Sequence, residues 1–127
     1  MGQPAKCGKC RAPLATAVKP VDVTDATFER LVLGASTPVL LDCWADWCGP
    51  CRMLAPTVDA LARDYAGRVL VAKLDVDANP LTAGRFDVRS IPTLLVFRDG
   101  QVVQRLLGVQ SRGALDAVLR SHLPAGV

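Results

Sequence analysis

The sequence of 127 residues contains no hydrophobic run that approaches the ~18 residues of a membrane-spanning helix. Its first residues, Met1–Lys6, lack the apolar segment of a secretory signal peptide. We therefore expect a cytoplasmic protein with no membrane partner.

Aromatic residues and charge are also scarce. The chain has two tryptophans, one tyrosine and three phenylalanines, and its net charge of +3 is spread along the sequence without a dense Lys/Arg block. Nucleic-acid-binding proteins usually gather basic and aromatic side chains on one surface. We therefore expect no nucleic-acid partner.

Length and cysteine content indicate how the chain is divided. The sequence is long enough for one domain that buries a core without disulfide staples. Residues 1–17 differ in character, because Cys7-Gly8-Lys9-Cys10 lies there among prolines, small residues and basic residues. We predict an N-terminal extension over 1–17 and one folded domain over 18–127. Five cysteines in a reducing compartment indicate catalysis or metal binding rather than a disulfide framework.

The most informative stretch is Trp47-Cys48-Gly49-Pro50-Cys51. The segment before it, Val39–Ala45, is short and nearly continuously apolar, which predicts a strand buried on both faces. After it, apolar residues recur at the spacing of an amphipathic helix, at Leu54, Val58, Leu61, Ala62 and Tyr65. The two thiols therefore lie where a buried strand ends and a helix begins.

That position predicts thiol chemistry without a cofactor. At a helix start, unpaired N–H groups and the positive end of the helix dipole favour a thiolate, so we predict Cys48 as the nucleophile. Cys51, one helical turn further on, is the predicted resolving thiol of a mixed disulfide. Gly49 and Pro50 are expected to tune the balance between dithiol and disulfide. The alternative is a CxxC pair that only binds metal or is buried.

The remaining elements complete an α/β pattern. Residues 18–23 and 69–74 read as strands, the first at a sheet edge because Pro20 cannot donate to a ladder. Residues 91–97 and 101–107 predict an antiparallel hairpin, since Asp-Gly between such runs is a strong turn signal.

Four helices are expected between and after these strands. Predicted caps are Thr24 for a segment ending at Gly34, Asn79 for a short helix to about Phe86, and Ser111 for the last helix. Pro56 should kink the helix that follows the CxxC. The predicted fold is a mixed sheet of about five strands flanked by about four helices.

A carboxyl group interrupts the central strand. Asp42 stands between apolar neighbours, where burial should raise its pKa toward neutrality and suit it to exchange protons with Cys51. Lys73, in the neighbouring strand pattern, is the candidate counter-charge, and an ordinary buried ion pair is the alternative. Cys43 alternates away from Asp42, so we interpret it as a buried apolar filler rather than a regulatory thiol.

The sequence resembles the thioredoxin family over roughly residues 20–123. The resemblance rests on Trp44-Ala45-Asp46-Trp47-Cys48-Gly49-Pro50-Cys51, Asp42, Pro56, Lys73, Ile91-Pro92-Thr93, the Asp99-Gly100 turn and Gly108. It implies the thioredoxin fold, a monomer, and a general protein-disulfide reductase that needs no catalytic cofactor. It further implies disulfide-containing protein substrates and an NADPH-dependent thioredoxin reductase as partners. The resemblance also supports the pairing of Asp42 with Lys73.

The resemblance implies the substrate-binding residues as well. It implies a cis bond between Ile91 and Pro92, which brings this backbone against the CxxC, where an extended substrate segment would pair as an added strand. Trp47, Ile91, Gly108 and Val109 would form a flat apolar collar around the thiols.

The N-terminal extension resembles that of bacterial thioredoxins with a zinc-binding extension. That subfamily carries two CxxC pairs, whereas this sequence has only Cys7 and Cys10. A tetrahedral zinc site needs four ligands. A half-site completed by a second chain, a second disulfide and a relic without function are the three interpretations of this pair.

A different functional class uses the same surface without chemistry. A non-enzymatic, chaperone-like module with this fold would hold partner proteins and would not need Cys48. An exported oxidant would need an export signal and a different dipeptide between the thiols.

Overall fold

The computed structural model describes residues 18–123, which form a five-stranded sheet between two helical layers. The strands are β2 (Val21–Val23), β3 (Val39–Trp44), β4 (Leu70–Asp75), β5 (Thr93–Arg98) and β6 (Gln101–Leu107). The helical elements are η2 (Glu29–Leu33), α1 (Gly49–Asp64), α2 (Pro80–Arg85) and α3 (Arg112–Ser121). The α/β thioredoxin-type architecture predicted from the sequence is confirmed.

The sheet is mixed, with the strand order β2-β4-β3-β5-β6. β4 pairs in parallel with both β2 and β3, whereas β5 runs antiparallel to β3 and β6. As predicted, β2 is an edge strand and the Asp99-Gly100 turn closes an antiparallel hairpin. β3 is central, so the strand that leads into the CxxC has neighbours on both sides.

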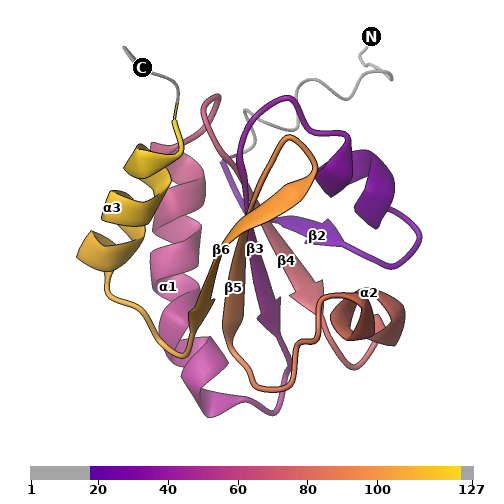
Figure 1. Ribbon diagram of the computed structural model, residues 1–127. Helices are drawn as coiled ribbons and strands as arrows, with labels where there is room; N and C mark the ends of the chain where they lie inside the picture. Colours follow the sequence, from indigo (N-terminus) through magenta and orange to yellow (C-terminus); the bar gives the residue numbers. More distant parts are fainter. Residues whose placement is uncertain (1–17, 124–127) are drawn as a thin grey trace, which may run out of the picture.

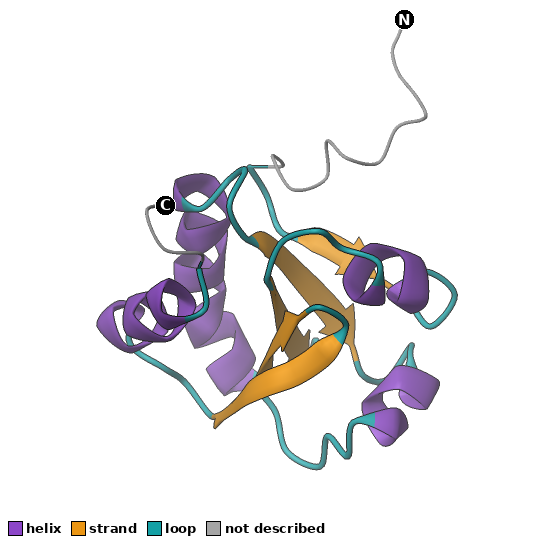
Figure 2. Ribbon diagram, turned by 45° about the horizontal axis from the view of Figure 1, so that its top comes forward, coloured by secondary structure: helices purple, strands orange, loops and turns teal. Residues whose placement is uncertain are grey.

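Each face of the sheet buries its own apolar cluster. Figure 1 shows α1 and α3 on one face and η2 and α2 on the other, and Figure 2 shows the sheet between these layers. Because side chains alternate along a strand, Leu40 of β3 packs in the cluster of α1 and α3, whereas Leu41 and Cys43 pack in the opposite cluster. The same alternation turns Asp42 toward α1.

The long helix α1 carries the cysteines at its first turn. It continues through Pro56, and Figure 1 shows it changing direction near the end that carries the cysteines. A proline within a helix removes one backbone donor and crowds the preceding turn, which explains this bend.

Two of the predicted side-chain caps are not formed, although Asn79 is the N-cap residue of α2 as predicted. The side chain of Asn79 does not cap α2 but accepts a hydrogen bond from the backbone N–H of Asp25, at 2.8 Å. In exchange, the Asp25 carboxylate accepts from Leu81 N and Thr82 N, so it caps α2 from another segment. This Asp25–Asn79 exchange joins two loops that lie 54 residues apart in the sequence.

The segment after β2 also differs from the predicted regular helix. No side-chain cap is formed at its start, and Thr24 N donates to Thr27 Oγ1 instead. The element is a single π-helical turn, closed by Gly34 N donating to Glu29 O at 2.9 Å. Ser111, in contrast, caps α3 as predicted by accepting from Ala114 N at 3.1 Å.

Candidate active site

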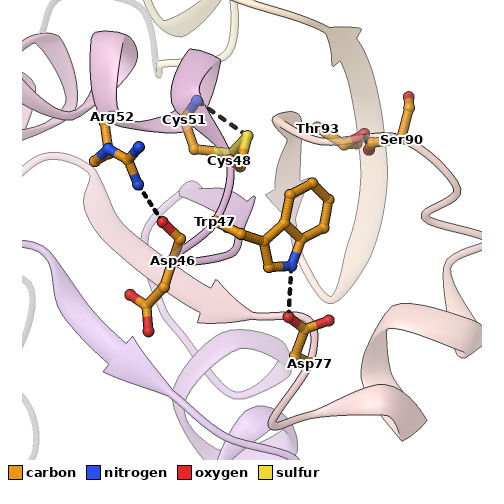
Figure 3. The surroundings of a disulfide bond; sticks show 8 residues. All are labelled: Asp46, Trp47, Cys48, Cys51, Arg52, Asp77, Ser90 and Thr93. Atoms are coloured by element: carbon orange, nitrogen blue, oxygen red, sulfur yellow. Dashed lines mark hydrogen bonds between the residues drawn. A yellow bond between two sulfur atoms is a disulfide. The ribbon is translucent and has the colours of Figure 1, made fainter.

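The two cysteines of the CxxC form a disulfide at the start of α1, with their Cα atoms 5.2 Å apart. Cys48 is the N-cap of the helix, with extended backbone angles, and its Sγ accepts a hydrogen bond from Cys51 N at 3.1 Å (Figure 3). Pro50 occupies the first turn, where its missing N–H breaks no helical bond. The sulfur of Cys48 therefore takes the place of a capping oxygen.

The surroundings of this cap favour a negative charge on the sulfur. The first turn of α1 contains no acidic residue, so no carboxylate offsets the positive end of the helix. Arg52 lies in the same turn and donates to the backbone oxygen of Asp46 (Figure 3). Cys48 and Cys51 are each 3% exposed, so the disulfide is largely buried.

Asp42 is a buried acid on the face of β3 that is turned toward α1. It is 1% exposed, and its Oδ1 has no hydrogen-bond partner among residues 18–123. Burial raises the pKa of Asp42 from 3.8 to about 6, and the positive charge of Lys73 opposes this increase. At neutral pH the carboxyl group can therefore both accept and release a proton.

Lys73 is paired with Asp42 by register, as β4 lies beside β3. No ion pair within 4.0 Å joins their charged groups in the part of the chain that the structure describes. The ammonium of Lys73 instead lies 4.5 Å from the ring centroid of Trp44. Lys73 therefore acts on Asp42 through its field rather than through a direct contact.

Two of the residues predicted for substrate binding, Pro92 and Gly108, contact each other, and a third, Trp47, directly precedes Cys48 in the chain. The Ile91–Pro92 peptide bond is cis, and Pro92 O accepts a hydrogen bond from Gly108 N at 2.9 Å. Gly108 has a φ of +82°, a conformation that favours glycine. Val109 is 46% exposed and Trp47 is 68% exposed, so both present apolar surface to solvent.

One residue of this site was not predicted from the sequence. Trp47 Nε1 donates to Asp77 Oδ2 at 2.8 Å, which orients the exposed indole (Figure 3). Trp47 follows β3 and Asp77 follows β4, and the ends of parallel strands meet at one edge of a sheet. That rule could have drawn attention to Asp77, although many acids occupy such positions.

Cys43 lies away from this chemistry. It is fully buried in the cluster under η2 and α2, on the opposite face of the sheet from α1. Burial raises the pKa of its thiol to about 12, the charge of Asp42 adds to the increase, and Arg105 opposes it. The thiol is therefore protonated at neutral pH, in agreement with the interpretation as an apolar filler.

Neither a metal centre nor a membrane span is present within residues 18–123. These residues contain no group of three or more His, Cys, Asp or Glu side chains that could hold a metal ion. None of the helices described is long and apolar enough to cross a bilayer. Cys7 and Cys10, the predicted zinc ligands, lie outside the described residues.

Comparison with known proteins assigns this site to a family. A sequence model described as thioredoxin matches residues 19–121. The chain belongs to the thioredoxin family. It is a thiol-disulfide oxidoreductase with protein-disulfide reductase activity, and the Cys48–Cys51 pair is its redox-active dithiol.

Individual thioredoxins agree with this assignment. Thioredoxin 1 of Synechococcus elongatus is 50% identical over 101 residues, which cover 80% of this chain and 94% of that protein. Thioredoxin of Pseudomonas aeruginosa is 50% identical over 103 residues, or 81% of this chain and 95% of that protein. The structure of a mutant thioredoxin from Halobacterium salinarum superposes with a TM-score of 0.79 at 35% identity, covering 88% of this chain and 97% of that one.

Proposed function

We propose that Cys48 is the attacking sulfur in the reduction of protein disulfides, and that Cys51 is the resolving sulfur. The observation that carries this assignment is the hydrogen bond from Cys51 N to Cys48 Sγ at the start of α1. A thiolate on Cys48 would keep this bond and gain the favourable field of the helix N-terminus. No comparable donor reaches Cys51 Sγ among the hydrogen bonds of the described residues.

The reaction then runs through two exchanges. The thiolate of Cys48 attacks one sulfur of the substrate disulfide, a Cys48–substrate disulfide forms, and the other substrate sulfur leaves as a thiolate that takes up a proton. Cys51 loses its proton and attacks Cys48 Sγ, so the Cys48–Cys51 disulfide forms and the second substrate sulfur is released. Two electrons have passed from the protein to the substrate. Gly49 and Pro50, in the first turn of α1, tune the potential of this step.

Asp42 is the proposed acceptor of the Cys51 proton. A pKa of about 6 lets Asp42 take up a proton when the resolving thiol ionises and release it afterwards at neutral pH. The Lys73 charge keeps the pKa from rising further and so maintains the carboxylate as a base.

The thiolate assignment predicts the rate at which Cys48 is alkylated. Reduced protein at pH 7 should react with iodoacetamide at Cys48 roughly tenfold faster than the same cysteine in urea-unfolded protein. The reason is that a helix start raises the thiolate fraction of a CxxC cysteine from a few per cent to about half. Peptide mass spectrometry resolves Cys48 from the other cysteines. Equal rates in folded and unfolded protein would exclude an activated sulfur.

The proposed substrate surface is the apolar collar of Trp47, Ile91, Gly108 and Val109, together with the backbone around Pro92. Trp47 and Val109 are the exposed side chains of this surface, and the backbone at the cis Ile91–Pro92 bond would pair with an extended segment of a protein substrate. The Trp47 indole is held in this surface by Asp77.

A charge placed in the collar should affect large and small substrates differently. We expect Val109→Arg to raise the KM for a protein disulfide about tenfold and to leave reduction of a small disulfide, such as oxidised glutathione, within twofold of wild type. The matched control is Val103→Arg, which changes another exposed valine, 41% exposed and located in β6, the strand that ends two residues before Val109. Equal effects of both variants on the protein substrate would show that Val109 does not contact it.

The family also suggests a source of electrons. We propose that an NADPH-dependent thioredoxin reductase returns the Cys48–Cys51 disulfide to the dithiol in the cytoplasm, and that the zinc-free protein is a monomer. Membership of the thioredoxin family supports this partner.

The N-terminal cysteines enter the proposal as a half-site. Thiolates of Cys7 and Cys10 are chemically suited to zinc, but two ligands do not complete a tetrahedral site. In this proposal a second copy of the chain supplies the other two. Metal analysis of reduced protein should then find one zinc per two chains, and a zinc-free protein would remove this part of the proposal.

A further inference from the structure

A cavity of about 360 Å³ lies between the segment that precedes β2, α1 and β4, and the dithiol chemistry does not use it. Its lining residues are Val18, Lys19, Pro20, Asp59, Arg63 and Lys73. Asp59 follows Cys51 by eight positions on α1, which corresponds to roughly 12 Å along a helix axis. The cavity is therefore separate from the apolar collar around the disulfide.

The lining is unbalanced in charge. Lys19, Arg63 and Lys73 are cationic, whereas Asp59 is the one acid among the lining residues, and Asp22 of β2 is the register partner of Lys73. None of the three cations forms an ion pair within 4.0 Å with an acid of residues 18–123. Three cations around one cavity repel each other, and a bound anion would relieve that repulsion.

The chemistry of the lining specifies the kind of anion. Arg63 can offer a planar fork of N–H donors, and the two lysines can each offer an ammonium, a combination that suits phosphate, sulfate or carboxylate oxygens. Val18 and Pro20 add apolar surface, and a volume of about 360 Å³ is in the range of sites for small organic ligands.

The chain's own N-terminal segment does not provide such a group. Residues 1–17 contain three basic residues, Lys6, Lys9 and Arg11, and no aspartate or glutamate. Side chains of that segment would add positive charge to the cavity, so they cannot neutralise its three cations.

We propose that this cavity, the cationic pocket, binds a small oxyanion through Lys19, Arg63 and Lys73, with Val18 and Pro20 contacting any apolar group that the ligand carries. Binding there is coupled to the redox site through Lys73, because Lys73 is the register partner of Asp42. An anion beside Lys73 offsets the positive charge that favours ionised Asp42. The bound anion therefore makes Asp42 hold its proton more tightly, and by linkage protonation of Asp42 favours anion binding.

The direct test titrates the oxidised protein, in which no redox step intervenes. Amide NMR spectra at pH 7.5 and constant ionic strength are followed with inorganic phosphate, with phenyl phosphate and with sodium chloride. We expect saturable shifts at Lys19, Arg63 and Lys73 with both phosphates, tighter binding of phenyl phosphate, and no saturable shift with chloride. The absence of saturation with both phosphates would overturn the proposal.

Two variants separate a specific pocket from general attraction to a basic protein. Arg63→Ala should weaken phosphate binding at least tenfold, whereas Arg30→Ala, which removes an equal charge from an exposed site on η2, should change it less than twofold. Asp59→Asn should tighten binding severalfold, because it removes the one acid of the lining. Equal weakening by Arg63→Ala and Arg30→Ala would contradict a built site.

The coupling has its own readout. The carboxyl carbon resonance of Asp42 is followed against pH in sulfate and in chloride at equal ionic strength, since sulfate keeps its charge over the whole range. The midpoint for Asp42 should move upward in sulfate by a few tenths of a pH unit, and Arg63→Ala should remove the difference. Equal midpoints in the two salts would refute the coupling. The result does not depend on disulfide reductase activity, so it is distinguishable from a failure of the proposed function.

Discussion

Cys48→Ser is expected to lose all measurable reduction of protein disulfides, and Cys51→Ser is expected to lose turnover while still forming a mixed disulfide. Serine keeps the size and the capping geometry of Cys48, whose Sγ accepts from Cys51 N at 3.1 Å, but provides no thiolate to attack sulfur. In Cys51→Ser the first exchange remains possible and the second does not. Insulin reduction measures the loss, and non-reducing gels with mass spectrometry measure the trapped adduct.

The matched control is Cys43→Ser or, if the buried hydroxyl destabilises the fold, Cys43→Ala. Cys43 lies on β3, the strand that leads into the site, but it forms no disulfide, is fully buried and packs on the opposite face of the sheet. Either control should keep activity within about threefold of wild type. A trapped adduct on Cys51 in Cys48→Ser protein would reverse the assigned roles. Retention of the biological activity by Cys48→Ser would favour the non-enzymatic, partner-binding class.

Asp42→Asn is expected to raise the free energy of unfolding and to slow the reduction of disulfides. The pKa of Asp42 is about 6 in the folded protein against 3.8 for an unperturbed carboxyl, so the folded state holds the proton more tightly. The contribution of Asp42 to the free energy of unfolding is therefore most favourable below about pH 4 and is lost as pH rises through about 6. Above that pH the free energy of unfolding is lower by about 3 kcal/mol than it would be with a neutral Asp42. Asparagine carries no titrating group, so the variant should gain up to this amount at pH 7.

Urea unfolding between pH 4 and pH 8 measures this difference. The free energy of unfolding of the wild type should decrease over the interval relative to Asp42→Asn, and Glu29→Gln, an exposed change on η2, should follow the wild type. The turnover of Asp42→Asn, expressed relative to wild type, should be lowest above pH 6, where the wild-type carboxylate is available as a base. Parallel stability curves, or equal rates across pH 6 to 9, would contradict a buried acid that exchanges protons.

The sequence predicts the centre of this molecule well because the relevant signals are local. An apolar run, two thiols and an amphipathic stripe follow each other between Val39 and Tyr65, and each signal has a period or a spacing that one element explains. The mixed sheet follows because its hairpin and its parallel unit also lie within short stretches. The raised pKa of Asp42 was predicted for a similar reason, since one acid in an apolar strand is visible in the sequence.

Features that depend on contacts between distant segments were not predicted. The bond from Trp47 to Asp77 spans 30 residues, and the Asp25–Asn79 exchange spans 54. The lining of the cationic pocket comes from three separate segments. Each of these residues has an ordinary local role available, such as a solvated charge or a helix cap. Whether such a residue keeps its local role or forms the distant contact depends on how the folded segments are placed beside each other.

The Asp25–Asn79 exchange also affects the order in which the chain can fold. The helix α2 has six residues, too few to persist alone in water, and the carboxylate that caps it belongs to a segment before η2. A peptide cut from 75–90 would therefore be largely unstructured. During folding, α2 should therefore become stable only after β2 has docked beside β4. A helix late in the sequence thus depends on the strand that comes first.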